Sequence, residues 1–521
     1  MTQKHQPGQN PVHATKSTQS ASSRELAPSS GLAGGTVSRR GVLRGLGALA
    51  LLGAATGTGL NFPTPARAAT ATGTLNIPTL LDSTTDSSGT KVFTLNMQTG
   101  TTEILSGVSS ATAGFNQAYL GPVLKVTQGD TVQMDVTNNL SEVSTVHWHG
   151  AHIPPSVDGG PQNTIEAGAS FSPSFEINQA ACTLWFHPHA LSTTAKHIAL
   201  GLVGMIIVDD DTDGAAALPN TYGEDQYPLI IQSNPISSAG VLQYTTAGET
   251  ATTTTYPVLV NGSNIGVKGT PTLNVDAARV RFHVLNGSIA DIITITTTDG
   301  SSFTQVASDA ALLSTPLEVT SLKLVGGERA EICLDVTSSA SVTLQATVTA
   351  GGARGGSGTK SIVTVTSSAT SAADDLPDSL NTFTALDVSS PDATRTIALS
   401  NSGNTMYING VAGTTMDSME SSEIMTTLGN TEVWTITNST GLTHSFHLHD
   451  VPFQVQSIDG VAPTAGNAEW KDTILVGPRS TTIIAMQFID YADDTYAYML
   501  HCHNAVHEDE GMMTMLMVMS S

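Results

Sequence analysis

The most reactive side chains of this sequence are its histidines, which gather in four short motifs. Ten of the 15 histidines fall in HWH, HPH, HSFHLH and HCHNAVH, and the last motif also holds one of the 3 cysteines. Imidazole and thiolate bind borderline and soft transition metals, so the set predicts a metal site. The motif residues are His147, His149, His187, His189, His444, His447, His449, His501, Cys502, His503 and His507.

Each motif contains a His-x-His pair, and this spacing has a geometric meaning on a β-strand. Residues i and i+2 of a strand point to the same face, so both imidazoles of a pair can reach one metal cluster. In the last motif Cys502 lies between His501 and His503, so its side chain must point to the opposite face. One short strand would therefore contact two metal centres.

The ligand types narrow the choice of metal. A thiolate with two imidazoles and a weak thioether suits an electron-transfer copper. Cys502, His507 and Met512 supply such a set from one loop, and His444 joins it from upstream. The other eight motif histidines are too many for a structural zinc, which takes about four ligands in a closed shell, and they suit a copper cluster.

These motifs need strands to position them, and the sequence between them predicts strands. Short apolar stretches alternate with polar residues and are separated by Gly, Pro, Asn and Asp, as in all-β proteins. Blocks of this texture span residues 74–211, 227–366 and 380–521, with a polar linker at Ser367 to Ser379. The first and third blocks share a strand-turn-strand pattern ahead of their histidines, which suggests a duplicated domain. Three Greek-key β-sandwich domains fit this organisation.

The charge balance limits the partners of the chain. Its 521 residues carry a net charge of −24, yet the first 68 hold seven basic side chains and one acidic, which leaves −30 on the rest. So acidic a surface repels nucleic acid and anionic membrane surfaces. We expect neither as a partner, and we expect a monomer.

The N-terminal 68 residues have the layout of an export signal. SRRGVLRG (Ser38 to Gly45) precedes an uncharged Gly/Ala/Leu stretch, and Ala66-Arg67-Ala68 fits a cleavage site. The paired arginines resemble a twin-arginine signal. An anchor helix is the alternative, but the stretch has too many glycines to sit firmly in a bilayer. We expect cleavage near Ala68, no remaining membrane span, and a periplasmic or extracellular protein.

The remaining cysteines and histidines allow simpler interpretations. Cys182 and Cys333 either pair with each other or stay as buried free thiols. The isolated His152, His197 and His283 are expected to be core or surface residues rather than ligands.

The motifs together resemble those of multicopper oxidases, in particular the bacterial three-domain laccase-like and copper-efflux oxidases. VDGGPQ (Val157 to Gln162), WFHPH, WKDTILV and GMM add to the histidine motifs. The resemblance implies three cupredoxin domains, which we place after the export signal (1–68) at 69–220, 221–370 and 371–521, the third with a type 1 copper. It also implies four copper ions, one type 1, one type 2 and two type 3.

The resemblance assigns each ligand and two acids. The type 1 set would be His444, Cys502, His507 and axial Met512; the type 2 set His147 and His447; and the two type 3 sets His149, His187 and His503, and His189, His449 and His501. A reductant would dock near an exposed edge of the type 1 site, and electrons would pass through Cys502 to the cluster, where O2 becomes water. Asp158 and Glu508 match acids that the family uses near the cluster; a turn aspartate and a solvated glutamate are the alternatives.

The substrate is the least determined part of the prediction. Copper-efflux members carry a Met-rich insert and an acidic residue shortly before the first type 1 histidine, whereas here STGLT precedes His444 and residues 392–410 hold no insert. Met406, Met416, Met419 and Met425 are better explained as core residues. We therefore expect a laccase-like oxidase of phenols and aromatic amines. The alternatives are a cuprous oxidase and, less favoured, a copper-free structural relative.

Overall fold

A computed structural model describes residues 73–105, 107–237, 239–242, 244, 253–351 and 356–520. The predicted export segment at residues 1–68 lies outside this part. Within these ranges, no helix has the length and apolar character needed to cross a membrane.

The first block of strands forms two sheets with a core between them. One sheet contains, in spatial order, β1 (Thr84–Thr85), β2 (Lys91–Leu105), β5 (Thr131–Asn138) and β7 (Ser170–Phe171), with β3 (Val108–Phe115) beside β2 and β8 (Ser174–Glu176) beside β5. The other contains β4 (Val123–Thr127), β10 (Gly204–Asp209), β9 (Cys182–His187) and β6 (His147–His149). Every second side chain of β5 is buried in the core, as its apolar-polar alternation predicts. Helices α1 (Thr194–Leu200) and α2 (Asp213–Ala216) flank β10 along the chain.

The second block repeats this arrangement without a histidine motif. Its larger sheet contains β15 (Ser263–Asn264), β14 (Val258–Val260), β11 (Gln226–Ser233), β17 (Arg279–Asn286), β22 (Arg329–Asp335), β19 (Phe303–Ala307) and β20 (Leu312–Val319). Its smaller sheet contains β16 (Thr272–Val275), β24 (Gly358–Ser367), β23 (Val342–Thr349), β18 (Ile292–Thr297) and β21 (Leu322–Leu324). The block also contains the strand pair β12 (Ile236–Ser237) and β13 (Thr253–Thr255) and helix α3 (Ile265–Lys268). Apolar side chains of both sheets share one core.

The third block again consists of two sheets. The first contains β26 (Thr405–Ile408), β25 (Ala393–Ser402), β28 (Thr431–Asn438), β33 (Thr481–Gln487), β30 (Phe453–Ile458) and β31 (Trp470–Lys471). The second contains β27 (Ile424–Thr427), β35 (Met513–Met519), β34 (Tyr498–Cys502), β29 (His444–Leu448) and β32 (Thr473–Val476). Helices α4 (Met416–Glu420) and α5 (Ala505–Asp509) and a 3-10 turn at Ala465–Asn467 complete the block, and Cys502 and Met512 belong to its core.

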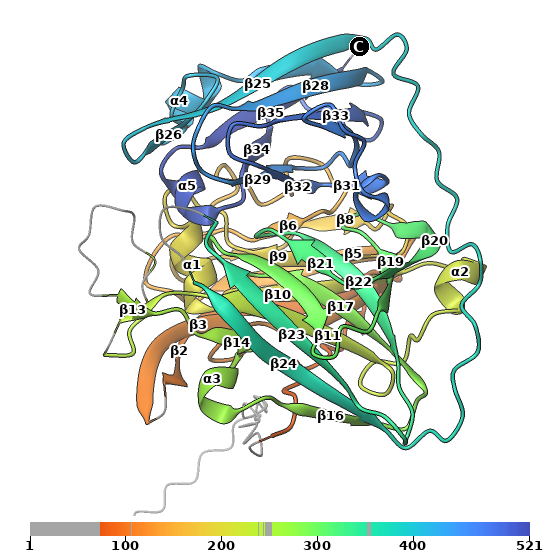
Figure 1. Cartoon of the computed structure of the whole chain (residues 1–521). Coiled ribbons are helices and arrows are strands. Elements are labelled where there is room, and N and C mark those ends of the chain that lie inside the picture. Colours follow the sequence, from red (N-terminus) through yellow and green to blue (C-terminus); the bar gives the residue numbers. More distant parts are fainter. Residues whose placement is uncertain are drawn as a thin grey trace, which may run out of the picture. The chain divides into compact units, whose positions relative to one another are not determined.

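The first and third blocks present their histidine strands in the same way. β6 pairs antiparallel with β9 and places His147 opposite His187, while β29 pairs antiparallel with β34 and places His447 opposite His501. In Figure 1, β6 lies next to β29 and β32, so the two sets of motif strands face each other. The paired sheets confirm the all-β prediction, and the domain boundaries stay a prediction.

Candidate metal centre

Eight histidines from the first and third blocks meet in one buried cluster. Each is at most 1% exposed, and their rings stack or meet edge to face. The members are His147, His149, His187, His189, His447, His449, His501 and His503. Residues 147–149 and 447–449 lie on or just past β6 and β29, and the other four lie at the ends of β9 and β34. The i, i+2 spacing therefore directs each pair into the cluster, as the sequence predicted.

Three of these rings direct nitrogen atoms toward a common point. The Nε2 atom of His501 lies 3.0 Å from that of His189 and 3.2 Å from that of His449. The Nδ1 atom of His449 donates to the Asp158 carboxylate at 2.7 Å, so its Nε2 atom carries the lone pair. The other two Nδ1 atoms lie 3.4 Å (His189) and 3.0 Å (His501) from Glu508. Lone pairs that converge in this way need a cation between them.

The opposite side of the cluster has a similar arrangement. The Nε2 atoms of His503 and His187 lie 3.4 Å apart, and the His187 Nδ1 atom donates to the carbonyl of Pro188 at 3.0 Å. The rings of His149 and His503 have centroids 4.9 Å apart. His147 also approaches this side, since the ligand atoms of His147, His149 and His187 lie within 4.8 Å of one another.

The last two rings have their outer nitrogen bound to backbone. Nδ1 of His147 donates to the carbonyl of Asp158, and Nδ1 of His447 to that of Asp472, both at 2.9 Å. Both Nε2 atoms have no hydrogen-bond partner among the described residues. Each stacks on a ring from the other block, His147 on His449 at 3.8 Å and His447 on His149 at 3.7 Å.

The structure thus brings together all eight histidines that the sequence assigned to a cluster. His189, His449 and His501 form the group that was predicted as one type 3 set. His187 lies against His147 and His149 as well as His503, so the division of the other five into type 2 and type 3 sets stays a prediction.

A second group surrounds Cys502 on the other face of β34. The Sγ atom lies 3.5 Å from Nδ1 of His444 and 3.7 Å from Nδ1 of His507. Met512 is also buried, and its backbone connects it to this group. Its carbonyl accepts from the Cys502 amide at 2.9 Å, and its amide donates to the carbonyl of His507. Nε2 of His444 donates to the hydroxyl of Thr440 at 2.8 Å, which leaves Nδ1 free to bind a metal.

The protonation states of both groups suit metal binding. Burial lowers the pKa of His444 to about 4 and that of His189, His501, His503 and His507 to about 3, so these imidazoles are neutral. Burial raises the pKa of the Cys502 thiol to about 12. A thiolate there needs a bound cation, and metal binding would release its proton.

The donor sets fit copper better than other metals. Nitrogen atoms without a hydrogen-bond partner among the described residues converge in the eight-histidine cluster, in a shell that neutral imidazoles alone would leave unsatisfied. The smaller group offers one sulfur and two imidazoles, and Met512, which shares the core with Cys502, could add a thioether to complete the set for an electron-transfer copper.

Asp158 and Glu508 both lie against the cluster and are almost fully buried, at 1% and 2% exposure. Asp158 contacts His449 through its carboxylate and His147 through its carbonyl. Glu508 faces His189 and His501 with its two oxygens. A solvated glutamate and an isolated turn aspartate, the simpler interpretations, are therefore excluded, although proton transfer by either acid stays a prediction.

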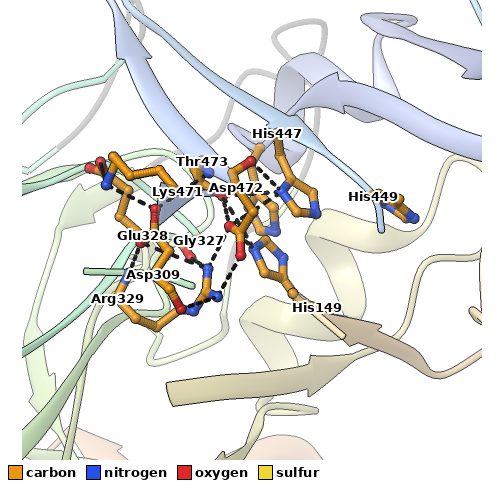
Figure 2. Close-up of polar contacts among 12 residues, drawn as sticks. His149, Asp309, Gly327, Glu328, Arg329, His447, His449, Lys471, Asp472 and Thr473 are labelled. Carbon is orange, nitrogen blue, oxygen red and sulfur yellow. Dashed lines mark hydrogen bonds and ion pairs between the residues drawn. The ribbon is translucent and has the colours of Figure 1, made fainter. Parts of the chain in front are cut away.

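Sequence reasoning missed a group of charged residues behind the cluster. Asp472 accepts from Arg329, lies 3.3 Å from Nε2 of His149, and has Asp309, Glu328 and Lys471 close by (Figure 2). The WKDTILV motif contains Lys471 and Asp472 and was the one sequence feature that could have pointed to this charged group. Arg329, Asp309 and Glu328 come from the second block, which holds no histidine motif.

The three isolated histidines have structural partners, as expected. His283 lies 2.6 Å from the hydroxyl of Thr183, and His197 lies 3.3 Å from that of Ser144. His152 lies 3.3 Å from the carboxylate of Asp490. Cys182 on β9 and Cys333 on β22 are buried free thiols, so the disulfide alternative is excluded.

The paired sheets and shared cores make the chain an all-β protein of the cupredoxin-like class. Family models described as multicopper oxidase match residues 96–213 and 387–521. Over 447 residues the chain is 31% identical to multicopper oxidase mco of Staphylococcus haemolyticus, which covers 85% of this chain and 91% of that protein. The chain belongs to the multicopper oxidase family.

Two further relatives bear different names. Cell division protein FtsP of Rahnella is 31% identical over 455 residues, which is 85% of this chain and 90% of that protein. The solved structure of a laccase-like multicopper oxidase CueO from Ochrobactrum is 30% identical, with a TM-score of 0.75 over 85% of this chain and 100% of that one.

Proposed function

We propose that the chain is a laccase-like oxidase that couples one-electron oxidation of phenols or aromatic amines to the reduction of O2 to water. The observation that carries the proposal is the position of Cys502. Its sulfur lies between His444 and His507, while its sequence neighbours His501 and His503 belong to the eight-histidine cluster. Two peptide bonds therefore connect an electron-accepting site to an oxygen-reducing one.

The proposed holders of the metals are the predicted ligands. His444, Cys502, His507 and Met512 would hold one copper, and the eight clustered histidines would hold three. One-electron acceptance at the first site and four-electron reduction of O2 at the second are the chemistry that the coppers supply when bound. Four donor molecules would each lose one electron and one proton, which balances one O2 reduced to two water molecules.

The role proposed for the chain around the cluster is to exclude water and hold protons. Asp158 and Glu508 are the acids whose oxygens reach cluster histidines, at 2.7 Å from His449 and 3.0 Å from His501. Each is placed to pass a proton toward oxygen without being a ligand. Asp158 would serve the side of His147 and His449, and Glu508 the side of His189 and His501.

The proposed type 1 site, which would accept electrons from the donor molecule, is more enclosed than the sequence suggested. His444 and His507 are only 1% and 4% exposed, so an exposed histidine edge is not found in the described part of the chain. A narrow cavity of about 10 Å³ borders His444, with Gly326, Thr443, Ser445 and Asn504 in its wall. A phenol ring does not fit there and would dock outside this layer, with the electron crossing it to His444.

The described wall of that cavity offers cuprous ion no soft ligand. Its described residues include neither a thioether nor a carboxylate, whereas a cuprous ion needs soft ligands. The Ochrobactrum relative, which is 30% identical, is described as active toward lignin model compounds and lignosulfonate. Both observations support a phenol.

Cuprous oxidation is the second candidate, and a group of methionines favours it. Met419 on α4 is buried in one cluster with Met499, Met513 and Met515, and Met416, also on α4, and Met517 pack against it. Thioethers are ligands for cuprous ion. They are also flexible core residues, and four of the six are at most 3% exposed, so an ion would have to open the core to reach them.

Steady-state oxidation of a dimethoxyphenol and of chelated cuprous ion, with and without excess copper, tests the proposal. We expect phenol oxidation without added copper and little change when Met416 and Met419 become Leu, since Met-to-Leu exchange in a core costs below about 1.5 kcal/mol. Met406→Leu, in the third-block core, controls for loss of a thioether elsewhere. Phenol turnover only with added copper, together with slower cuprous oxidation in the Leu variant alone, would favour the second candidate.

A copper-free structural role is the least supported candidate, although the Rahnella relative is named a cell division protein. All ten motif histidines and Cys502 are present and lie in the two groups described above. Copper analysis of the purified protein separates this role from both oxidases. We also propose export to the periplasm or beyond, on the layout of residues 1–68.

A further inference from the structure

Five charged side chains lie buried together behind the histidine cluster. Arg329 and Asp309 are 0% exposed, Lys471 is 2% exposed, and Glu328 and Asp472 are 3% exposed. Charged residues are almost never buried so deeply unless they are paired, because removing them from water is costly. Arg329, Asp309 and Glu328 come from the second block, and Lys471 and Asp472 from the third.

Arg329 is at the centre of this group, and all of its donors are used. Its Nε atom donates to the carbonyl of Thr183 at 2.8 Å, its Nη1 atom to the carbonyl of Gly327 at 3.2 Å, and its Nη2 atom to the carbonyl of Asp309 at 3.0 Å. The same two Nη atoms also donate to the carboxylate of Asp472, at 2.7 and 2.6 Å. Arg329 thus joins the second block to the third through a bidentate ion pair and to the first through the carbonyl of Thr183.

Asp472 also contacts two cluster histidines, which come from different blocks. Its Oδ1 atom lies 3.3 Å from Nε2 of His149, and its carbonyl accepts from Nδ1 of His447 at 2.9 Å. The hydroxyl of Thr473 lies 3.2 Å from Nε2 of His149 and 3.1 Å from Nδ1 of His447. Figure 2 shows both rings directed at this one residue pair.

The consequence is that the two rings have opposite tautomers. Because Nε2 of His149 is occupied, its Nδ1 atom faces the cluster, and because Nδ1 of His447 is occupied, its Nε2 atom does. Both inward atoms have no hydrogen-bond partner among the described residues. The hydrogen bond that one ring nitrogen makes decides which nitrogen can bind a metal.

Asp472 is not itself free to be a ligand. Oδ1 accepts from Arg329 and from the Thr473 hydroxyl at 2.8 Å, and Oδ2 accepts from Arg329. Burial by itself would raise the pKa of Asp472, but the adjacent Arg329 guanidinium outweighs burial and holds that pKa below its ordinary value. The side chain is therefore an ionised acceptor that acts through the histidines.

The HWHG motif makes room for this ion pair. Gly150 follows His149 with φ +87°, and a Cβ atom there would lie 2.5 Å from Nη2 of Arg329 and 2.8 Å from Oδ2 of Asp472. A side chain at residue 150 would displace the pair from behind His149.

We propose that Asp472, held in place by Arg329, is a positioning residue that fixes the tautomer of His149 through its carboxylate and that of His447 through its backbone carbonyl, and so controls copper binding by the eight-histidine cluster. The second block, which supplies none of the predicted ligands, would then set metal occupancy through Arg329. The inference rests on the proposed function only in taking copper as the metal of the cluster.

The test compares copper binding in the parent, Asp472→Asn and Arg329→Lys. Asparagine keeps the size of the side chain but removes its charge, and lysine keeps the charge of Arg329 but loses the bidentate grip. Glu432→Gln is the matched control, because Glu432 is also fully buried and held by Arg395 through two hydrogen bonds, and in the described part of the chain it hydrogen-bonds to no histidine. The readouts are copper per chain, copper(II) retention against a chelator, the electron paramagnetic resonance signal of the type 2 copper, and thermal unfolding of the copper-free protein.

We expect Asp472→Asn and Arg329→Lys to weaken copper binding by the cluster by about 10–100-fold, as loss of an outer hydrogen bond to a ligand does. The type 2 signal should change as well, because the ion pair holds the Asp472 carbonyl against His447, a predicted type 2 ligand. The blue colour from the Cys502 site should stay. Glu432→Gln should lower thermal stability without altering either. Parent-like copper affinity and type 2 signal in both variants would overturn the inference, as would losses that only match the drop in thermal stability seen in the control.

These readouts separate the inference from the proposed function. If the parent binds copper but oxidises neither phenol nor cuprous ion, the proposed function fails, and copper retention in the variants still decides the role of Asp472. A parent that binds no copper overturns both.

Discussion

The Nε2 atoms of His189 and His501 lie 3.0 Å apart, while the Nδ1 atoms of the same rings face one carboxylate, that of Glu508. The residue that follows the C-terminal motif therefore orients a ring from the first block and a ring from the third. The two lone pairs that result point at each other, which is unfavourable until a cation lies between them. The relationship also places an acid directly behind two predicted ligands.

The first prediction concerns colour. Copper-loaded protein should be blue through charge transfer from the Cys502 thiolate, and Cys502→Ser should abolish the colour and turnover while the cluster keeps its copper. Visible absorption and copper analysis measure both. Cys333→Ala, which removes another buried thiol, should stay blue. Zinc in place of copper, or a blue Cys502→Ser variant, would refute the type 1 assignment.

The second prediction concerns the two acids. Asp158→Asn and Glu508→Gln should slow O2 reduction by about 10²–10⁴-fold, the usual contribution of a positioned proton donor, and should leave the blue colour unchanged. Stopped-flow reoxidation of the reduced protein across pH measures the effect. Asp509→Asn is a control on the same helix, because Asp509 accepts from the amides of Thr194 and Ala195 and, among the described residues, from no cluster ring. Parent-like pH profiles in both variants would leave the acids a purely structural role.

The sequence predicted the cluster well because its information is local. A His-x-His pair on a strand fixes the face of both rings, and the position of Cys502 between His501 and His503 fixes the opposite face for the thiol. Both features hold in the structure, where Cys502 contacts His444 while His501 contacts His189. Such statements depend on spacing of a few residues and on no knowledge of the tertiary fold.

The parts that could not be predicted depend on residues far apart. Arg329 and Asp472 are separated by 143 positions, and nothing in either local sequence says that their charges are buried together. The enclosure of His444 also depends on distant segments, since Gly326 and Asn504 line the cavity beside it. Tertiary packing decides which polar residues lose water, and no periodicity in the sequence reports it.

The third prediction is a pH-dependent stability. Burial raises the pKa of Asp291 to about 6 in the folded protein, against an ordinary value of 3.8. Below pH 3.8 both states are protonated, so stability is unaffected. As pH rises to about 6 the unfolded state ionises first, and folding loses about 3 kcal/mol, a loss that persists above pH 6.

Asp291→Asn should remove this loss, because an amide oxygen can still accept from the amide of Gly356. The variant should therefore be more stable than the parent at pH 7 and similar to it near pH 4. Denaturant unfolding at a series of pH values measures the difference. A difference between parent and variant that does not vary with pH would contradict the raised pKa.

The fourth prediction concerns the hydroxyl behind the type 1 site. Thr440 donates to Asn438 at 2.7 Å, so its oxygen accepts the Nε2 proton of His444 and leaves Nδ1 to face Cys502. Thr440→Val keeps the shape but leaves that buried Nε2 donor unsatisfied, which costs about 1–3 kcal/mol. We expect type 1 copper to be held about 10–100-fold more weakly against a chelator, with the cluster copper unchanged. Thr440→Ser restores the oxygen and should restore the affinity. If the valine variant holds its blue copper as tightly as the parent, the hydroxyl does not orient His444, and the orientation of the ring is fixed by β29 alone.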